Sequence, residues 1–218
     1  QSVSNAETTV FQSNTWNSLE ASNIAKDLQV GGMKYLNTAS TTDAVRDTLT
    51  NTDGFNAKQT DYIVSYLKTG ISAYDAEKGT LYNIYGLDEP QVESILNSLT
   101  SGYSVKNAEI YTLINHVGWN TRESSYIAND IQGKDMTYNN AVYDALNVAD
   151  GFGVKERNEI MVYIANGETP SNAILHKIEN QGWTETQAVH IQKNMLDNAI
   201  GYTTGEKNEL KTMGFSLL

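Results

Sequence analysis

A short pattern recurs along the chain about every 32 residues and constrains the fold more than any other feature. It consists of a small residue, a large apolar residue, a helix-capping residue, and Glu or Gln three positions after the cap. The apolar position falls at Trp16, Phe55, Leu87, Trp119, Phe152, Trp183 and Phe215. Successive copies are 31 to 33 residues apart, except for a first interval of 39. Such a period predicts a chain of tandem structural repeats.

Each copy of the pattern predicts the end of one helix and the start of the next. In Gly118-Trp119-Asn120-Thr121-Arg122-Glu123 the glycine permits the left-handed backbone that ends a helix. Asn120 then caps the next helix, and Glu123 reaches back to the amide of the cap, which makes a capping box. The large apolar residue before the cap packs against the first turn. We therefore expect Phe55, Leu87, Trp119, Phe152 and Trp183 to be structural turn residues.

A second start signal lies in phase with the first. It is Ser or Thr, followed three positions later by Asp or Asn and then by Ala. Its capping residues are Ser40, Ser72, Ser104, Thr137 and Thr169, with a degenerate copy at Thr203. Two signals per period predict an all-α fold of tandem helix hairpins, an α-solenoid-like array of about 12 short helices. The expected helices cover residues 18–29, 41–53, 57–69, 73–85, 89–101, 105–117, 121–132, 138–150, 154–166, 170–181, 185–199 and 205–213, and residues 30–39 form one long connection.

A longer repeat relates the two halves of the chain. The stretch from Trp16 to Gln29 matches the stretch from Trp119 to Gln132, and Asp53-Gly54-Phe55 matches Asp150-Gly151-Phe152. The matching blocks are residues 16–102 and 119–201. We therefore predict an extended N-terminal segment, 1–15, and a single helical-repeat domain, 16–218, built as a duplicated three-unit block.

The composition argues against several classes of partner. The net charge of −11 disfavours nucleic acid and anionic membrane surfaces, which attract Lys and Arg. The acidity serves solubility, or it allows divalent cations to bridge acidic surfaces. No Cys is present, which excludes disulfides and thiolate metal sites. No apolar run approaches the ~20 residues of a membrane span, so we expect no membrane insertion.

The start of the sequence indicates a location outside the cell. The chain begins at Gln1 rather than Met, which suggests a mature chain whose signal peptide was removed before Gln1. Its first residues are rich in Ser, Thr and Asn. We expect a secreted protein, extracellular or at the cell surface, and an artificial start is the alternative.

The two ends of the predicted array are complementary. The first helix, 18–29, follows the Trp-Asn pattern but lacks the Ser- or Thr-capped helix that should precede it. The last helix, 205–213, is of the Ser- or Thr-capped kind and is followed by Gly214-Phe215-Ser216 without a further helix. The ends could close a ring within one molecule, join successive molecules into a filament, or act as simple caps. For the filament, the expected assembly residues are Val10, Phe11, Trp16, Leu19, Phe215, Leu217 and Leu218.

Candidate catalytic and metal-binding residues are sparse. His176 and Glu179 lie one helical turn apart, but a third ligand is not evident and a surface pair is the simpler interpretation. Asp53-Gly54 and Asp150-Gly151 lack the acidic ligands of a calcium loop and are interpreted as helix ends. Carboxylate pairs such as Glu156 with Glu159 are expected by chance among 26 acidic residues. We therefore expect no enzyme, cofactor or metal.

A set of tyrosines could bind a glycan or protein partner. We expect Tyr82, Tyr85, Tyr111, Tyr126 and Tyr143 to be partly exposed, and exposed tyrosines stack on sugars or fill interfaces.

The stretch Gly182-Trp183-Thr184-Glu185-Thr186-Gln187-Ala188 follows Ser171, Ile174 and Ile178 at helical spacing. This pattern resembles the helix-turn-helix repeats of the host-cell-surface-exposed lipoprotein family. That family is linked to phage superinfection exclusion at the bacterial surface. The present chain departs from it, since it has no lipid-anchor Cys, more units and an acidic charge. The resemblance implies an extracellular, non-enzymatic role.

These observations lead to one hypothesis with two alternatives. The leading hypothesis is a structural protein that self-assembles head to tail into a filament or surface layer. The first alternative is a monomeric surface module for binding, adhesion or phage exclusion, which takes a glycan or protein. The second is a polysaccharide-active enzyme on a closed helical ring, which would need a cleft with two carboxylates of unequal pKa.

Overall fold

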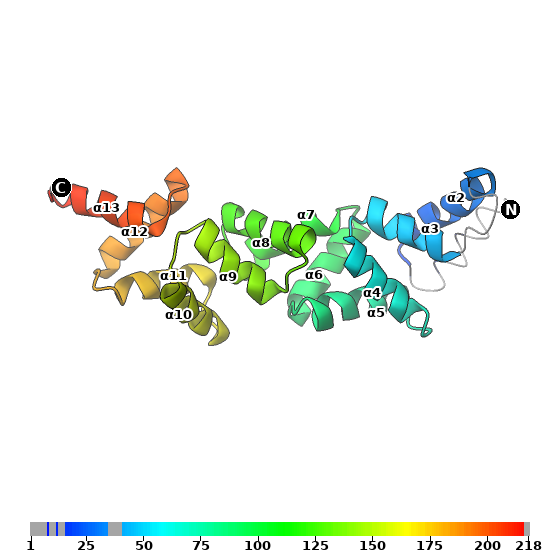
Figure 1. Ribbon diagram of the computed structural model, residues 1–218, viewed down its shortest axis with the longest axis horizontal. Coiled ribbons are helices and arrows are strands. Elements are labelled where there is room, and N and C mark those ends of the chain that lie inside the picture. Colours follow the sequence, from blue (N-terminus) through cyan, green and yellow to red (C-terminus); the bar gives the residue numbers. More distant parts are fainter. Residues whose placement is uncertain (1–7, 9–11, 13–15, 35–40, 216–218) are drawn as a thin grey trace. The chain divides into compact units, whose positions relative to one another are not determined.

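The computed structural model describes Thr8, Gln12, residues 16–34 and residues 41–215, with the side chains of 29–34 and 41 left aside. Within these ranges all regular structure is helical and adjacent helices pack in pairs, which confirms the predicted all-α class (Figure 1). Short turns join consecutive helices, as the two start signals per period predict.

The helices occupy almost every segment in which they are expected. They are α2 (Ser18–Lys34), α3 (Thr41–Asp47), η1 (Thr48–Thr52), α4 (Ala57–Leu67), α5 (Ala73–Gly79), η2 (Thr80–Ile84), α6 (Glu89–Thr100), α7 (Val105–Thr112), η3 (Leu113–Val117), α8 (Thr121–Lys134), α9 (Tyr138–Val148), α10 (Val154–Ala165), α11 (Pro170–Glu179), α12 (Glu185–Asn198) and α13 (Tyr202–Thr212). The three η elements are π-helical turns that continue α3, α5 and α7.

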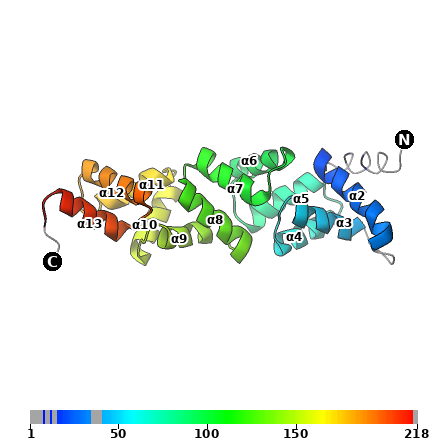
Figure 2. The same cartoon turned by 90° about the horizontal axis from the view of Figure 1, so that it is seen from above.

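The chain divides into two compact units. The N-terminal unit comprises Gln1–Thr112 and Ile131–Thr137, and the C-terminal unit comprises Leu113–Asp130 and Tyr138–Leu218. In the N-terminal unit α2 packs on α3, α4 on α5, and α6 on α7. In the C-terminal unit α11 packs on both α10 and α12, and α12 lies beside α13 (Figure 2).

Five of the predicted capping boxes form in the structure, whereas Gly153 at the start of α10 makes no side-chain cap. At the start of α4, Gln59 N donates to Asn56 Oδ1 at 2.8 Å and Asn56 N donates to Gln59 Oε1 at 2.9 Å. The same reciprocal exchange occurs at Asn17 with Glu20, Asp88 with Gln91, Asn120 with Glu123, and Thr184 with Gln187. These bonds satisfy amide groups that the helix itself cannot satisfy.

We call the turns at Phe55, Leu87, Trp119 and Phe152 the inner joints. At each of them the amide of the large apolar residue donates a hydrogen bond to the carbonyl six residues earlier. Phe55 N donates to Leu49 O at 2.9 Å, and the φ of 76° at Gly54 allows this reversal without a Cβ clash. Equivalent bonds join Leu87 to Leu81, Trp119 to Leu113, and Phe152 to Leu146. The turn therefore directs each apolar side chain inward.

The structure corrects several predicted boundaries. Helix α2 continues through Gly31 and Gly32 to Lys34, where a connection over 30–39 was expected. Each glycine costs about 1 kcal/mol relative to Ala, which a packed helix tolerates. Helix α8 runs past Gly133, and the left-handed residue is Asp135 with a φ of 57°. Helix α12 ends at the left-handed Ala199 rather than at Gly201.

Each unit has its own buried apolar core. Fully buried side chains of the N-terminal unit include Ile24, Leu49, Phe55, Ile63, Leu81 and Ile95. Those of the C-terminal unit include Leu113, Trp119, Ile127 and Phe152. Burial of each such side chain stabilises the fold by about 1.5–3 kcal/mol. Trp119 also donates its indole N–H to the Tyr138 hydroxyl at 3.1 Å, which satisfies the one polar atom of the ring.

Candidate functional site

The predicted assembly residues lie in different environments. Leu19 and Phe215 are 43% and 57% exposed, whereas Trp16 is buried. Val10, Phe11, Leu217 and Leu218 lie outside the described residues. In a single molecule, the side chains of Leu19 and Phe215 are therefore exposed and available for contact with a second molecule.

The turn residues are buried at the inner joints but not at the last two. Phe55, Leu87, Trp119 and Phe152 are at most 3% exposed. Trp183 is only half-buried, and its indole N–H donates to Glu206 Oε1 at 3.0 Å. Phe215 is the most exposed member of the set.

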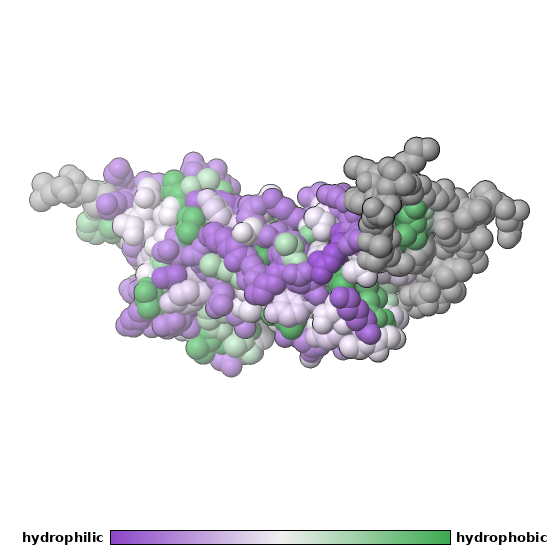
Figure 3. All heavy atoms as spheres, turned by 45° about the vertical axis from the view of Figure 1, so that its right-hand side comes forward, coloured by the Kyte–Doolittle hydropathy of each residue, from purple (hydrophilic) through white to green (hydrophobic). Residues whose placement is uncertain are grey.

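The tyrosine set is only partly exposed. Tyr82 and Tyr111 are 50% and 46% exposed, and Tyr126 and Tyr143 are half-buried. The expected exposure of Tyr85 is wrong, because its ring is buried and its hydroxyl donates to Asp135. The apolar side chains on the face shown in Figure 3 lie among hydrophilic ones.

His176 has a partner other than the predicted one. Its Nδ1 lies 3.1 Å from Glu168 Oε1, and its ring stacks on Tyr163 with centroids 4.3 Å apart. Among the described residues no group of three or more His, Asp or Glu could hold a metal ion.

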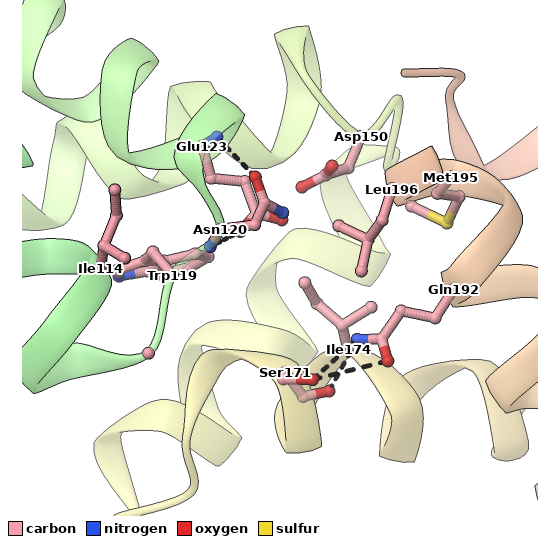
Figure 4. Close-up of a pocket in the computed structure, with 11 residues that line it drawn as sticks. Ile114, Trp119, Asn120, Glu123, Asp150, Ser171, Ile174, Gln192, Met195 and Leu196 are labelled. Atoms are coloured by element: carbon pink, nitrogen blue, oxygen red, sulfur yellow. Dashed lines mark hydrogen bonds between the residues drawn. The ribbon is translucent and has the colours of Figure 1, made fainter. Parts of the chain in front are cut away.

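The C-terminal unit contains a cleft that the sequence did not reveal. It consists of cavities of ≈ 150 and ≈ 270 Å³ that share the lining residues Asn120, Asp150, Met195 and Leu196. Figure 4 shows the carboxyl group of Asp150 directed toward Asn120 and Glu123, with Leu196 on the other side. We refer to the two cavities together as the cleft.

Local hydrogen bonds hold the polar wall of the cleft. Glu123 N donates to Asn120 Oδ1 at 3.0 Å, as the capping box requires. The carbonyl of Asp150 accepts a hydrogen bond of 2.6 Å from Tyr202 N at the start of α13. Glycine is favoured beside this contact, because the φ of 71° at Gly151 is a conformation that other residues rarely adopt. Asp150 is thus fixed between α9 and α13.

The opposite wall is largely apolar. It is formed by Ile174 from α11 and by Met195 and Leu196 from α12. Gln192 Nε2 donates to Ser171 O at 3.0 Å, which ties α12 to α11 at the edge of the cleft. Leu196 is 47% exposed, so one side of this wall faces solvent.

Two buried carboxyl groups dominate the electrostatics of the cleft. Glu123 and Asp150 are each 3% exposed, and their side chains share a hydrogen bond. Burial, and then the negative charge of Glu123, raise the pKa of Asp150 to about 9. Burial also raises the pKa of Glu123, although hydrogen bonds from Asp150 and Asn120 oppose the increase. The protonation of each carboxyl group therefore depends on that of the other.

A related cluster lies in the N-terminal unit. Glu20 and Asp53 correspond to Glu123 and Asp150 in the duplicated sequence, and the carbonyl of Asp53 accepts a 2.6 Å hydrogen bond from Val105 N. Here a third buried carboxyl, Glu77, joins the pair. The residue 97 positions after Glu77 is Ile174, which is part of the apolar wall of the cleft.

The carboxyl pair does not have the spacing of a glycosidase. Two carboxyl groups that share a hydrogen bond are closer than the ~5 Å or more that separates acid and nucleophile in retaining enzymes. Glu123 also uses its side chain in the capping box. The same pair recurs as Glu20 and Asp53, which supports a structural contribution in both units.

Sequence reasoning missed the cleft because it treated Asp150 as a helix end and Glu123 as a cap. Both assignments describe the backbone correctly, but neither reveals that the two carboxyl groups meet. The available signal was the duplication, since Glu and Asp recur together in both blocks.

Comparisons with protein-family models, curated proteins and solved structures found no significant match. None of the described helices has both the length and the apolar character needed to cross a membrane.

Proposed function

We propose that this protein is a non-enzymatic structural protein, a tandem array of helix hairpins that assembles head to tail outside the cell. The observation that carries the proposal is the exposure of Phe215. Its equivalents Phe55 and Phe152 are at most 1% exposed, whereas Phe215 is 57% exposed. A second molecule that supplied the missing neighbours would bury this ring as the inner joints do.

Recurrent local geometry supports the repeat interpretation. Asp53 O and Asp150 O each accept a 2.6 Å hydrogen bond, from Val105 N and Tyr202 N respectively. The two contacts lie at matching places in the duplicated blocks. We infer that the array is a duplicated three-unit block, in which contacts repeat because the sequence repeats.

The exposed residues would act as anchors of a larger interface. Burial of the side chains of Leu19 and Phe215 would contribute about 1.5–3 kcal/mol each. A stable interface needs about 1,000 Å² or more, so neighbouring polar residues must complete it. Aromatic anchors at the centre of an interface commonly carry much of the binding free energy.

The test is the mass distribution of the full chain by light scattering, with electron microscopy of the same sample. Regular polymers are expected for the native chain. Phe215→Ser should reduce assembly strongly because it removes the anchor. Tyr82→Ser is the matched control, since Tyr82 is also 50% exposed but lies far from the chain ends in sequence. A native chain that stays monomeric at high concentration would refute the proposal.

A second candidate function is a surface-binding module for glycans. Tyr103 and Tyr111 are 49% and 46% exposed, and their ring centroids lie 6.4 Å apart. Paired exposed rings offer a platform for the apolar face of a sugar. Retention of the monomer on polysaccharide or peptidoglycan, lost in Tyr103→Ala, would favour this function over assembly. The resemblance to surface-exposed lipoprotein repeats supports an extracellular location for either function.

A further inference from the structure

The cleft has a counterpart in the N-terminal unit, where a carboxylate completes the equivalent contact between helices. There the start of α4 lies against the end of α8, and Asn56 Nδ2 donates to Ile131 O at 3.3 Å. Lys58 of α4 pairs with Asp135, and the buried Tyr85 donates its hydroxyl to the same carboxylate. The side chain of Asp135 therefore binds two donors at this contact.

The same contact in the C-terminal unit lacks that carboxylate. The residues 64 positions after Asn56, Lys58, Ile131 and Asp135 are Asn120, Arg122, Met195 and Ala199. Asp135 and Ala199 both have a left-handed backbone, with φ of 57° and 50°, but Ala199 has no polar side-chain atom to offer Arg122. Because Asn120, Arg122 and Met195 line the larger cavity, the cleft lies at the contact that Asp135 completes in the N-terminal unit.

The charges of the cleft favour a neutral ligand. Arg122 and Asp150 both line the larger cavity, so a cation would meet a guanidinium there and an anion would meet a carboxyl group. Asp150 is 3% exposed, and apart from its hydrogen bond with Glu123 its Oδ2 has no partner among the described residues. A hydroxyl group suits both sides, since it accepts from a guanidinium and either donates to a carboxylate or accepts from a carboxylic acid. This match holds whichever protonation state Asp150 has.

The walls and the size of the cleft favour a ring that carries several hydroxyls. Figure 4 shows Asn120 and Asp150 on one side of the cleft, with Ile174 and Leu196 on the other. Amide, guanidinium and carboxyl groups are forked, so each can bind two neighbouring hydroxyls, while aliphatic side chains pack against the C–H face of a ring. Cavities of ≈ 150 and ≈ 270 Å³ hold one six-membered ring but not most drug-sized ligands.

We propose that the cleft binds one pyranose ring of a sugar, with neighbouring hydroxyls on Arg122 and Asp150 and its C–H face on Met195 and Leu196. A free monosaccharide and the terminal residue of a polysaccharide both carry this ring. The proposal goes beyond head-to-tail assembly, and it does not depend on the tyrosine platform of the second candidate function, because the cleft lies wholly in the C-terminal unit.

The experiment is a titration of the full chain with the methyl β-pyranosides of glucose, galactose and mannose. It is followed through the NMR methyl signals of Ile174, Met195 and Leu196, which line the cleft. We expect saturable shifts with at least one sugar and a dissociation constant on the order of 1 mM. The control ligand is 2-methoxytetrahydropyran, which has the same ring without the free hydroxyls and should bind at least about tenfold more weakly.

The two units provide matched variants. Arg122→Gln should weaken sugar binding by about tenfold, whereas Lys58→Gln, the same change at the equivalent position, should leave it within about twofold. Ala199→Asp should bring a carboxylate to Arg122, as Asp135 does to Lys58, and should abolish the shifts. Asp adopts the left-handed conformation more readily than Ala, so this variant should melt no lower than the native chain.

The source of the sugar and the fate of the proposal follow from these titrations. Tighter binding of the β-1,4-linked disaccharide of the preferred sugar would identify a polysaccharide end, and equal or weaker binding would identify a free monosaccharide. Both outcomes support the site. The proposal is overturned if no pyranoside gives saturable shifts, if 2-methoxytetrahydropyran or n-butylammonium binds as tightly, or if Arg122→Gln and Ala199→Asp bind like the native chain. Light scattering tests assembly separately, so either proposal can fail without the other.

Discussion

Glu20, Asp53 and Glu77 place three carboxyl groups in the interior of the N-terminal unit. Burial raises the pKa of Glu20 to about 7 and, with the charge of Glu20, raises the pKa of Asp53 to about 8. Burial followed by the charges of Glu20 and Asp53 raises the pKa of Glu77 well above its ordinary value. Three such groups cannot all be ionised without a large electrostatic cost.

In the part of the chain that the structure describes, the basic side chains of α3, α4 and α5 pair with carboxylates outside this cluster. Arg46 of α3 pairs with Asp61 at 2.5 Å, Lys58 of α4 pairs with Asp135, and Lys78 of α5 pairs with Glu89 and Glu93. Lys26 and Lys68 are exposed. Of the remaining acidic side chains of the packed elements, five are exposed, namely Asp43, Asp47, Asp61, Asp75 and Glu89, and two are half-buried, Asp27 and Glu93. Protonation, rather than pairing with a basic side chain, therefore removes the charge of this cluster.

The first prediction is that stability falls as the pH rises from 5 to 9. A carboxyl whose pKa is higher in the folded state stabilises that state fully below its unfolded pKa, near 4. This contribution is lost as the pH rises through 7 and 8, where Glu20 and Asp53 ionise in the folded protein. The free energy of unfolding should fall by a few kcal/mol. Each kcal/mol corresponds to a decrease of about 2–4 °C in the melting temperature of a chain of this length. Circular dichroism melts across this pH range measure it.

The matched variants for this prediction are Glu77→Gln and Glu93→Gln. Glu77→Gln removes a buried ionisable group and should raise the melting temperature at pH 9 and flatten its pH dependence. The side chain of Glu93 is 39% exposed, and hydrogen bonds from Lys78 and Tyr74 lower its pKa. Its replacement should leave the slope between pH 5 and 9 unchanged. Equal slopes for all three proteins would contradict the prediction.

At the scale of the element, helix α13 packs closely on α12 through a glycine. A Cβ on Gly205 would lie 3.2 Å from both Ile191 Cγ2 and Met195 Cγ, and 3.3 Å from Ile191 O. These distances are shorter than ordinary van der Waals contact, and one of the atoms belongs to the backbone. The close approach of the two helices therefore requires the missing side chain.

The second prediction compares two helical glycines. Gly205→Ala should destabilise the protein by about 1–3 kcal/mol, because the core must shift to admit a methyl group. Gly133→Ala, within α8, should stabilise it by about 0.5–1 kcal/mol, because its Cβ would meet no atom within 4 Å and Ala favours the helix. Urea denaturation measures both values. Opposite signs are the essential result, and a stabilising Gly205→Ala would show that the helices are not in close contact.

At the scale of the whole molecule, the net charge of −11 opposes association between copies of the chain. The proposed assembly brings like-charged molecules together through small apolar anchors such as Phe215. The repulsion acts over about 30 Å at 0.01 M salt but only about 10 Å at 0.1 M.

The third prediction is that assembly increases with ionic strength. Light scattering should report larger particles at 0.3 M than at 0.01 M sodium chloride, because salt screens the repulsion and leaves the apolar contact intact. Magnesium chloride at matched ionic strength distinguishes screening from cation bridging. Screening predicts similar particle sizes with both salts, whereas assembly that appears only with magnesium would show that divalent cations bridge acidic surfaces.

Much of the helical organisation could be predicted from the sequence. Capping boxes such as Asn56 with Gln59, and turns such as Gly54-Phe55, depend on hydrogen bonds between residues at most six positions apart. The boundary at Asp135 was missed, because Asp adopts the left-handed conformation less often than Gly and its neighbour Gly133 gave the stronger signal. Local rules predict helix ends well only where one residue clearly dominates.

The sequence by itself determined which segments are helices, where the inner joints lie and which large side chains turn inward, because those features arise from short-range hydrogen bonds and periodic apolar residues. Tertiary structure alone decided which carboxyl groups are buried. It brought Glu123 and Asp150 together and placed Ile174 and Leu196 opposite them, residues that come from four separate parts of the chain. Burial, and the pKa changes that follow from it, depend on every neighbour in space. The cleft and the exposed Phe215 are therefore properties of the packed helices rather than of any one repeat.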